Sequence, residues 1–298
     1  MQKKCYMILS VLVLLVSFLP LKVQAGTFVV GAKTWYETTW DSAVLDIYKQ
    51  LFTDSLRKSD EIKYENIEYE TFTGNGYLAG PVIGYQTDDA IWSFSFAAMV
   101  LSHFNQEVRG SALATEAFGI VPPDPFRVID HTTVDVDRTD YDFTASYSLS
   151  SFKDKLSFLR YWKVFLGFKY QDVDYDFTFH TKIESGALSI TNSGTTSIDY
   201  EVYMPTLGIA FVYPFTEHIA VGIQGGAGVA HFEGYNAKDG FAFNVEGNFN
   251  IEPINNLIIQ LGYRYQEFRF ETDFPAPEKN YNATDKTYGP TLTIAYTF

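Results

Sequence analysis

The last stretch of the chain alternates between apolar and small side chains, which is the side-chain period of a β-strand. From position 288 to the end, every second residue is apolar or aromatic: Tyr288, Pro290, Leu292, Ile294, Tyr296 and Phe298. Gly, Thr or Ala stands at each position between them. Because successive side chains of a strand point to opposite faces, this segment predicts a strand with one apolar and one weakly polar face.

A strand that ends on an aromatic residue resembles the closing strand of bacterial outer-membrane β-barrel proteins. In that family the barrel-assembly machinery reads the terminal Phe and the alternate apolar positions, so the resemblance implies that Tyr296 and Phe298 are the assembly signal. It also implies a place in the outer membrane of a Gram-negative cell. There the expected neighbours are outer-membrane lipid and lipopolysaccharide.

The first residues have the pattern of a secretory signal peptide. Lys3 and Lys4 precede an apolar run over positions 7–21, and small residues follow up to Ala25. We expect cleavage after Ala25 and export through the periplasm, with residues 1–25 as signal and 26–298 as the barrel. Cys5 precedes the apolar run, which argues against a lipoprotein anchor. Cleavage would remove this one cysteine, and with it any disulfide, thiol catalysis or thiolate metal site.

Composition agrees with a barrel. Aromatic residues make up 17% of the chain, yet the mean hydropathy is −0.07 and no later stretch reaches the roughly 20 apolar residues of a helical span. A soluble β-sandwich also has alternating strands, but the signal peptide and the terminal Phe favour a barrel. The net charge of −14 becomes −17 when the signal and its three lysines are removed. This disfavours binding to nucleic acid, since phosphate contacts need Lys and Arg.

We therefore predict an all-β fold, a single antiparallel transmembrane barrel of about ten strands, with eight or twelve as alternatives. The expected strands cover 27–36, 76–86, 90–101, 139–149, 161–170, 203–213, a segment from 219, 241–251, 257–265 and 288–298. Short turns would lie in the periplasm and long loops outside the cell. A tight Asp88-Asp89 turn predicts Tyr85 opposite Trp92. Residues 62–72 also alternate, and we expect them to extend the second strand above the membrane.

Polar residues with inward parity predict a network in the lumen. Its members are Lys33, Lys163, Lys169, Asn244, Glu246, Asn248, Gln260 and Arg264. A turn centred near Ile254 would place Asn248 opposite Gln260, and Glu246 one diagonal step from Arg264. The network could line a conduit or fill a narrow barrel. We favour filling, because barrels of about eight strands are just wide enough to be packed by side chains, whereas open porins have 16–18.

A histidine and two carboxylates raise the possibility of catalysis at the rim. His103, Asp140 and Asp142 share inward parity near the expected extracellular end, and a His with a carboxylate could activate water. Omptin proteases are ten-stranded barrels with Asp–Asp and Asp–His pairs at the rim, but this chain has no local omptin motif, and likeness of fold alone is a weak argument. We expect no enzyme and no cofactor. His131, His180 and His231 are expected outside and apart.

Five carboxylates are expected together outside the membrane, on neighbouring strands: Asp135, Asp137, Asp172, Asp174 and Asp176. Calcium or magnesium could neutralise them. Without the spacing of a known metal motif, a solvated acidic strand edge is the preferred interpretation.

The long segment 37–74 is expected to carry a short amphipathic helix over 41–58, capping the barrel mouth. The leading functional prediction is a structural or surface-interaction role through acidic extracellular loops, and we expect the protein to be a monomer. The alternatives are a narrow channel for small solutes and, third, a rim hydrolase of omptin-like geometry.

Overall fold

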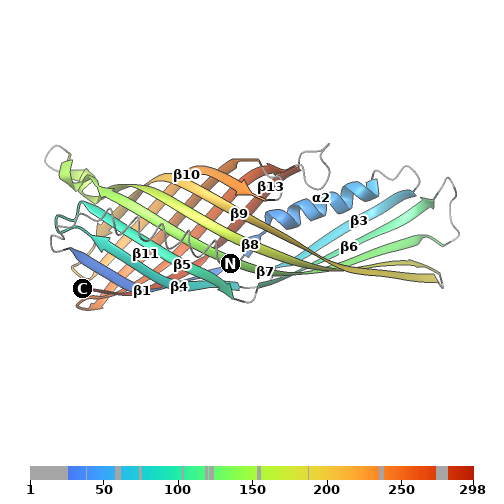
Figure 1. Cartoon of the computed structure of the whole chain (residues 1–298), viewed down its shortest axis with the longest axis horizontal. Helices are drawn as coiled ribbons and strands as arrows, with labels where there is room; N and C mark the ends of the chain where they lie inside the picture. Colours follow the sequence, from blue (N-terminus) through green and yellow to red (C-terminus); the bar gives the residue numbers. More distant parts are fainter. Residues whose placement is uncertain are drawn as a thin grey trace.

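The computed structural model describes residues 26–298 apart from 38, 58–61, 74–75, 103, 118–119, 121–123, 153–155, 187, 235–237 and 273–280. The expected signal peptide and His103 lie outside the described residues. Nearly all of the described chain is in antiparallel strands that form a closed barrel with a long extension at one end (Figure 1).

The strands follow the period-two segments of the sequence, several of them well beyond the expected ends. They are β1 (Thr27–Glu37), β2 (Thr39–Asp41), β3 (Ile62–Thr73), β4 (Gly76–Gln86), β5 (Trp92–Ser102), β6 (Phe104–Ala117), β7 (Phe126–Ser148), β8 (Trp162–Ser185), β9 (Leu188–Pro214), β10 (Ile219–Glu233), β11 (Gly240–Ile254), β12 (Leu257–Thr272) and β13 (Tyr281–Thr297). The helical elements are α2 (Ala43–Arg57), η1 (Leu149–Phe152) and η2 (Ser157–Tyr161).

Ten strands form the ring, in the order β1-β4-β5-β7-β8-β9-β10-β11-β12-β13, and β13 pairs with β1 to close it. This confirms the predicted fold class. The start of β1, the end of β13 and the short turns lie at one end of the barrel, which is the periplasmic end in single-chain outer-membrane barrels (Figure 1). At the other end, which we call the upper end, β7, β8 and β9 continue beyond the ring.

The extension is a five-stranded sheet with the order β3-β6-β7-β8-β9. β3 lies in line with β4, and β6 lies in line with β5. The register of the β4–β5 pair, which ends at Tyr77↔Ser102, continues without a shift into the β3–β6 pair, which begins at Thr73↔Gln106. The expectation that residues 62–72 extend the second strand is therefore confirmed. We call this part of the molecule the extracellular sheet.

The outer wall of the barrel has an apolar belt between two aromatic bands. Exposed apolar side chains include Val30, Ile83, Leu166, Leu207, Ile209, Ile223 and Leu261. Tyr141, Tyr170 and Tyr203 stand side by side at the upper edge, with ring centroids 5.9 and 5.1 Å apart. Trp162 packs on Phe211 at the lower edge, 5.2 Å between centroids. The stretch of β8 from Trp162 to Tyr170 has the length of a tilted transmembrane strand, which is about 9–11 residues.

Two predicted registers are wrong by two residues, although every side chain is on the expected face. Tyr85 lies opposite Phe94, not Trp92, because the hairpin closes on Thr87 and Trp92 with four residues between them. Asn248 lies opposite Gly262, not Gln260, and Glu246 lies directly opposite Arg264. A shift of two residues preserves the faces of a strand, since its side-chain period is two.

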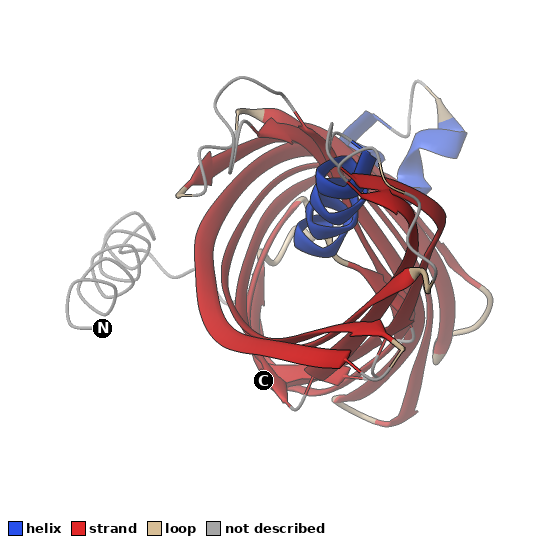
Figure 2. Ribbon diagram, turned by 90° about the vertical axis from the view of Figure 1, so that its right-hand side faces the viewer, coloured by secondary structure: helices blue, strands red, loops and turns tan. Residues whose placement is uncertain are grey.

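Helix α2 lies inside the mouth of the barrel, against β13 and β3 (Figure 2). Val44, Leu45 and Ile47 are almost fully buried, so the apolar face of the helix meets the aromatic side chains of the inner wall. The predicted capping helix is confirmed, with Ala43–Arg57 as its bounds. No helix among the described residues is long and apolar enough to span a membrane.

Candidate functional site

A layer of charged side chains crosses the barrel lumen near the upper edge of the apolar belt. Arg264 on β12 donates to Asp142 on β7, with 2.8 Å between Nη1 and Oδ2. These strands are five places apart in the ten-stranded ring, so the ion pair joins opposite walls. Lys169 on β8 likewise donates to Gln266 on β12 at 2.6 Å. Side chains from different sides of the ring therefore meet inside the lumen.

Asp140 is the most enclosed charge in this layer. Arg138 donates to both of its carboxylate oxygens, at 2.8 and 2.9 Å, and the Lys169 Nζ lies 2.6 Å from one of them. The side chains of Arg138 and Asp140 are fully buried. On the far side, Lys33 donates to both oxygens of Glu246, at 3.1 and 3.2 Å. Each carboxylate of this layer thus has a cation beside it, as burial of charge requires.

Trp35 stands at the centre of the layer. It is fully buried, and its ring lies 4.8 Å from the Arg264 guanidinium, 5.3 Å from the Lys169 ammonium and 5.7 Å from the Arg138 guanidinium. An indole ring attracts cations to its face. Trp35 therefore fills the space between three positive side chains that would otherwise repel one another. We call this group the ionic layer. Its members are Trp35, Lys33, Arg138, Asp140, Asp142, Lys169, Glu246 and Arg264.

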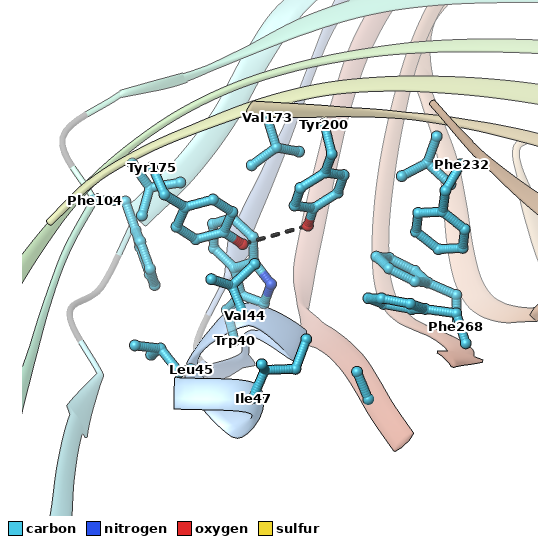
Figure 3. Close-up of a cluster of buried hydrophobic side chains, with 14 of the residues drawn as sticks. Trp40, Val44, Leu45, Ile47, Phe104, Val173, Tyr175, Tyr200, Phe232 and Phe268 are labelled. Carbon is cyan, nitrogen blue, oxygen red and sulfur yellow. Dashed lines mark hydrogen bonds between the residues drawn. The ribbon is translucent and has the colours of Figure 1, made fainter. Parts of the chain in front are cut away.

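An aromatic core lies directly above the ionic layer, between the wall and helix α2 (Figure 3). Trp40 packs on Phe104 and Tyr175, and its indole N–H donates to Asp285 at 2.9 Å. Phe232 packs on Phe268 and Phe270 from the opposite side. Tyr175 and Tyr200 are hydrogen-bonded to each other, and Tyr175 also to Ser42. The upper lumen is thus filled with packed side chains.

The predicted lumen residues divide into two groups. Lys33, Lys169, Glu246 and Arg264 come together in the ionic layer. Asn244, Asn248, Gln260 and Lys163 do not join it: Asn248 accepts a hydrogen bond from Asn250, and a Cβ at Gly222 would overlap its amide. The Phe165 ring of β8 lies over Gly208 and Gly226 in the same way. A Cβ at Gly208 would overlap the ring, and a Cβ at Gly226 would press closely on it. Glycines on these strands therefore make room for large side chains of neighbouring strands in the same wall.

The structure describes two members of the proposed rim triad, Asp140 and Asp142. Asp140 and Asp142 were expected at the solvent-exposed rim, but Asp140 is buried and Asp142 half-buried in the ionic layer, where Arg138, Lys169 and Arg264 hold them. His103 lies outside the described residues. The structure therefore gives no support to catalysis by this pair.

The acidic residues do converge on the outer face of the extracellular sheet. Asp135 lies opposite Asp176, and Asp137 opposite Asp174, on β7 and β8. Asp172 is the cross-strand partner of Thr139 and of Glu201. Like charges directly opposite each other destabilise a sheet. Within the described part of the chain, no group of three or more His, Cys, Asp and Glu side chains is arranged to hold a metal ion.

The histidines are closer together than expected. His131 and His180 are direct cross-strand partners on β7 and β8, which corrects the expectation that they lie apart. The His131 Nε2 is 2.6 Å from Glu107, and His231 contacts Asp239 separately. The error arose because the predicted strands ended at the membrane edge, whereas β7 and β8 remain paired to their tips.

Several residues of the lumen were missed by sequence reasoning: Trp35, Trp40, Arg138, Asp130 and Asp285. Arg138 has the same parity as Asp140 and Asp142, and this alternation was the available signal. Tyr48 lies in the segment 41–58, which the sequence predicted only as an amphipathic helix. Its hydroxyl donates to the buried Asp130 at 3.0 Å and lies 3.0 Å from the Thr132 hydroxyl, so it fastens the helix to β7.

Replacing Tyr48 by Phe is expected to lower the free energy of unfolding by about 1–2 kcal/mol at pH 8, since two hydrogen bonds to a buried carboxylate and its neighbour are lost. Burial raises the pKa of Tyr48 to about 12 from its ordinary value of 10. The wild type therefore holds this stabilisation below pH 10 and loses it as the pH rises toward 12. Urea unfolding at pH 8 and near pH 11 should show a difference between the two proteins that shrinks at the higher pH. A constant difference would show that the hydroxyl does not titrate as the contacts require.

No family model and no curated protein matches the sequence. Among solved structures, the outer membrane protease OmpT from Escherichia coli is similar with a TM-score of 0.48 and 11% identity, over 93% of this chain and 98% of that chain. The outer membrane protein OprG from Pseudomonas aeruginosa gives 0.32 and 11%, over 92% and 96%. The translocator domain of the autotransporter NalP from Neisseria meningitidis gives 0.33 and 10%, over 93% and 90%. Likeness at this level carries no activity over to this chain.

The class of protein follows from the structure itself. A closed antiparallel ring leaves no strand edge in the apolar belt, and the belt is bounded by aromatic bands. The chain is therefore an integral outer-membrane β-barrel protein with ten strands in its ring.

Proposed function

We propose that this protein is a non-conducting outer-membrane anchor that holds the extracellular sheet above the cell surface for contact with a partner. The observation that carries the proposal is the Arg264–Asp142 ion pair, which spans the lumen at 2.8 Å. A conducting pore needs a continuous hydrated path, and here the ionic layer and the aromatic core follow one another along the axis. The monomeric barrel, its contact with lipopolysaccharide and its recognition through Tyr296 and Phe298 belong to the same proposal.

The narrow channel is the alternative, and its test is direct. The chain without residues 1–25 would be refolded into planar bilayers, and a heat-modifiable gel shift would show that it is folded. We expect no stepwise openings from the folded protein. Stable single-channel steps would overturn the anchor and establish a channel, with the ionic layer as its selectivity region.

An enzymatic role has less support. The rim residues that suggested it are Asp140 and Asp142, and their charges are compensated within the ionic layer. The extracellular sheet is instead the part of the molecule that offers a large solvent-exposed surface.

A further inference from the structure

The extracellular sheet ends in two strands that have a pairing partner on one side only. β3 pairs with β6 alone, and the upper part of β9, residues 188–197, pairs with β8 alone among the described strands. β10 joins β9 only from Glu201 downward. All residues of 188–197 except Gly194 are exposed, so neither face of this stretch is covered. A strand edge in this state presents backbone donors and acceptors to a further strand.

The two edges differ in the features that prevent strand addition. β3 has register shifts between Lys63 and Glu68, a positive φ of 50° at Asn66, and further charges at Glu65 and Glu70. Bulges and charges are the devices with which proteins protect exposed edges. The β9 edge has none of them: from Leu188 to Ile198 there is no charge and no proline, and the ladder to β8 has no register shift.

The side chains of this edge define what could pair with it. Its outward face carries only small hydroxyl side chains, namely Ser189, Thr191, Ser193, Thr195 and Ser197. The other face carries Leu188, Ile190 and Ile198 at its two ends and Asn192 and Thr196 between them, and at Gly194 the Phe179 ring of β8 fills the place of a side chain. Hydroxyl residues favour Thr or Ser across a strand pair, and apolar residues favour β-branched ones.

The charges at the membrane-proximal end of the β9 edge indicate which end of the added strand should be positively charged. Asp199 and Glu201 follow the uncharged stretch, and Asp174 and Asp172 lie opposite them on β8. β9 runs toward the membrane, so an antiparallel strand added to it would begin at this acidic end. Positive residues at the start of the added strand would compensate the carboxylates.

We propose that residues 188–197 of β9 bind an extended segment of a partner polypeptide by antiparallel strand addition, and that this segment alternates Thr or Ser with β-branched apolar residues after Lys or Arg at its beginning. The proposal names the kind of partner that the anchored sheet would bind, and it rests on the proposed anchor function. A second copy of this chain fits less well. In one membrane both copies of β9 run downward, so their edges would meet in parallel and bring two acidic ends together.

The probe is a fluorescent synthetic peptide of about ten residues, Lys-Lys followed by repeated Thr-Val, titrated against the full protein in detergent micelles. We expect saturable binding. Two further peptides carry N-methyl groups on the odd or on the even residues, which removes backbone donors without changing side chains or charge. Only the set that faces the edge should lose affinity, by about tenfold or more. Equal affinity of all three peptides, or equal loss in both N-methylated ones, would overturn strand addition.

Two protein variants separate strand addition from charge attraction. Thr191→Lys with Thr195→Lys places charges on the edge strand and should weaken peptide binding. Ser111→Lys with Thr133→Lys adds the same charge to β6 and β7, inside the same sheet, and should leave it nearly unchanged. Equal weakening by both would overturn the proposal, and so would peptide-independent dimers that the β9 variant dissociates. A protein that conducts ions but binds the peptide at this edge would refute the anchor function alone.

Discussion

Replacing Asp140 by Ala is expected to lower the free energy of unfolding by about 3–5 kcal/mol, the cost of leaving buried charges uncompensated. Arg138 and Lys169 both depend on this carboxylate, at 2.8 and 2.6 Å, and none of the three side chains is more than slightly exposed. The measurement is urea unfolding of the protein refolded into lipid vesicles, followed by tryptophan fluorescence. Because Trp35 and Trp40 lie beside Arg138, the same experiment reports on the region that is disturbed.

The matched control is Asp135→Ala, on the same strand. Asp135 is exposed and faces Asp176, so its removal should change the stability by no more than about 0.5 kcal/mol, the usual range for surface substitutions. Asp140→Asn should fall between the two variants, since the amide keeps the shape and one acceptor. Equal losses for Asp140→Ala and Asp135→Ala would mean that the ionic layer is hydrated and contributes little to stability.

The fold was predictable because a membrane barrel depends on alternation, and alternation is visible in one sequence. From Tyr288 onward, β13 has an apolar side chain toward lipid at every second residue, and this is independent of which strand lies beside it. The amphipathic stripe of α2 was readable for the same reason. In both elements the sequence pattern and the burial arise from the same local periodicity.

Register and contacts across the lumen could not be predicted in the same way. The turn after Gln86 was assigned two residues, but Ala90 adopts a positive φ of 55° and the loop holds four, which moves β5 by two positions. The pairing of Arg264 with Asp142 depends on the stagger of all the strands between them. Parity shows that both side chains point inward, whereas their relative height along the axis comes only from the closed ring.

The lumen is blocked twice along its axis, by α2 in the aromatic core and by the ionic layer below it. We therefore expect the barrel to conduct ions only when both blocks are removed together. The first change replaces residues 42–58, including α2, by a Gly/Ser linker of the same length and removes the helix from the aromatic core. The second is Asp142→Ala with Arg264→Ala, which removes the ion pair across the lumen without leaving either charge alone. We expect each change by itself to give a silent protein in planar bilayers, because the other block remains. The combined variant should show stepwise single-channel openings.

The control removes an ion pair on the outer face of β12, the strand whose inner face carries Arg264. Glu267 and Arg269 are 2.5 Å apart on the outer face of β12, so Glu267→Ala with Arg269→Ala changes the same charges without touching the lumen. Combined with the linker, it should remain silent. Openings after the helix replacement alone would show that the ionic layer passes ions, and that α2 is the one closure of the barrel. Silence of the combined variant, once the gel shift shows it folded, would place the block in the wall aromatics Tyr175, Phe232 and Phe268 instead. Since all three belong to ring strands, the barrel would then be closed by its own wall rather than by the inserted helix.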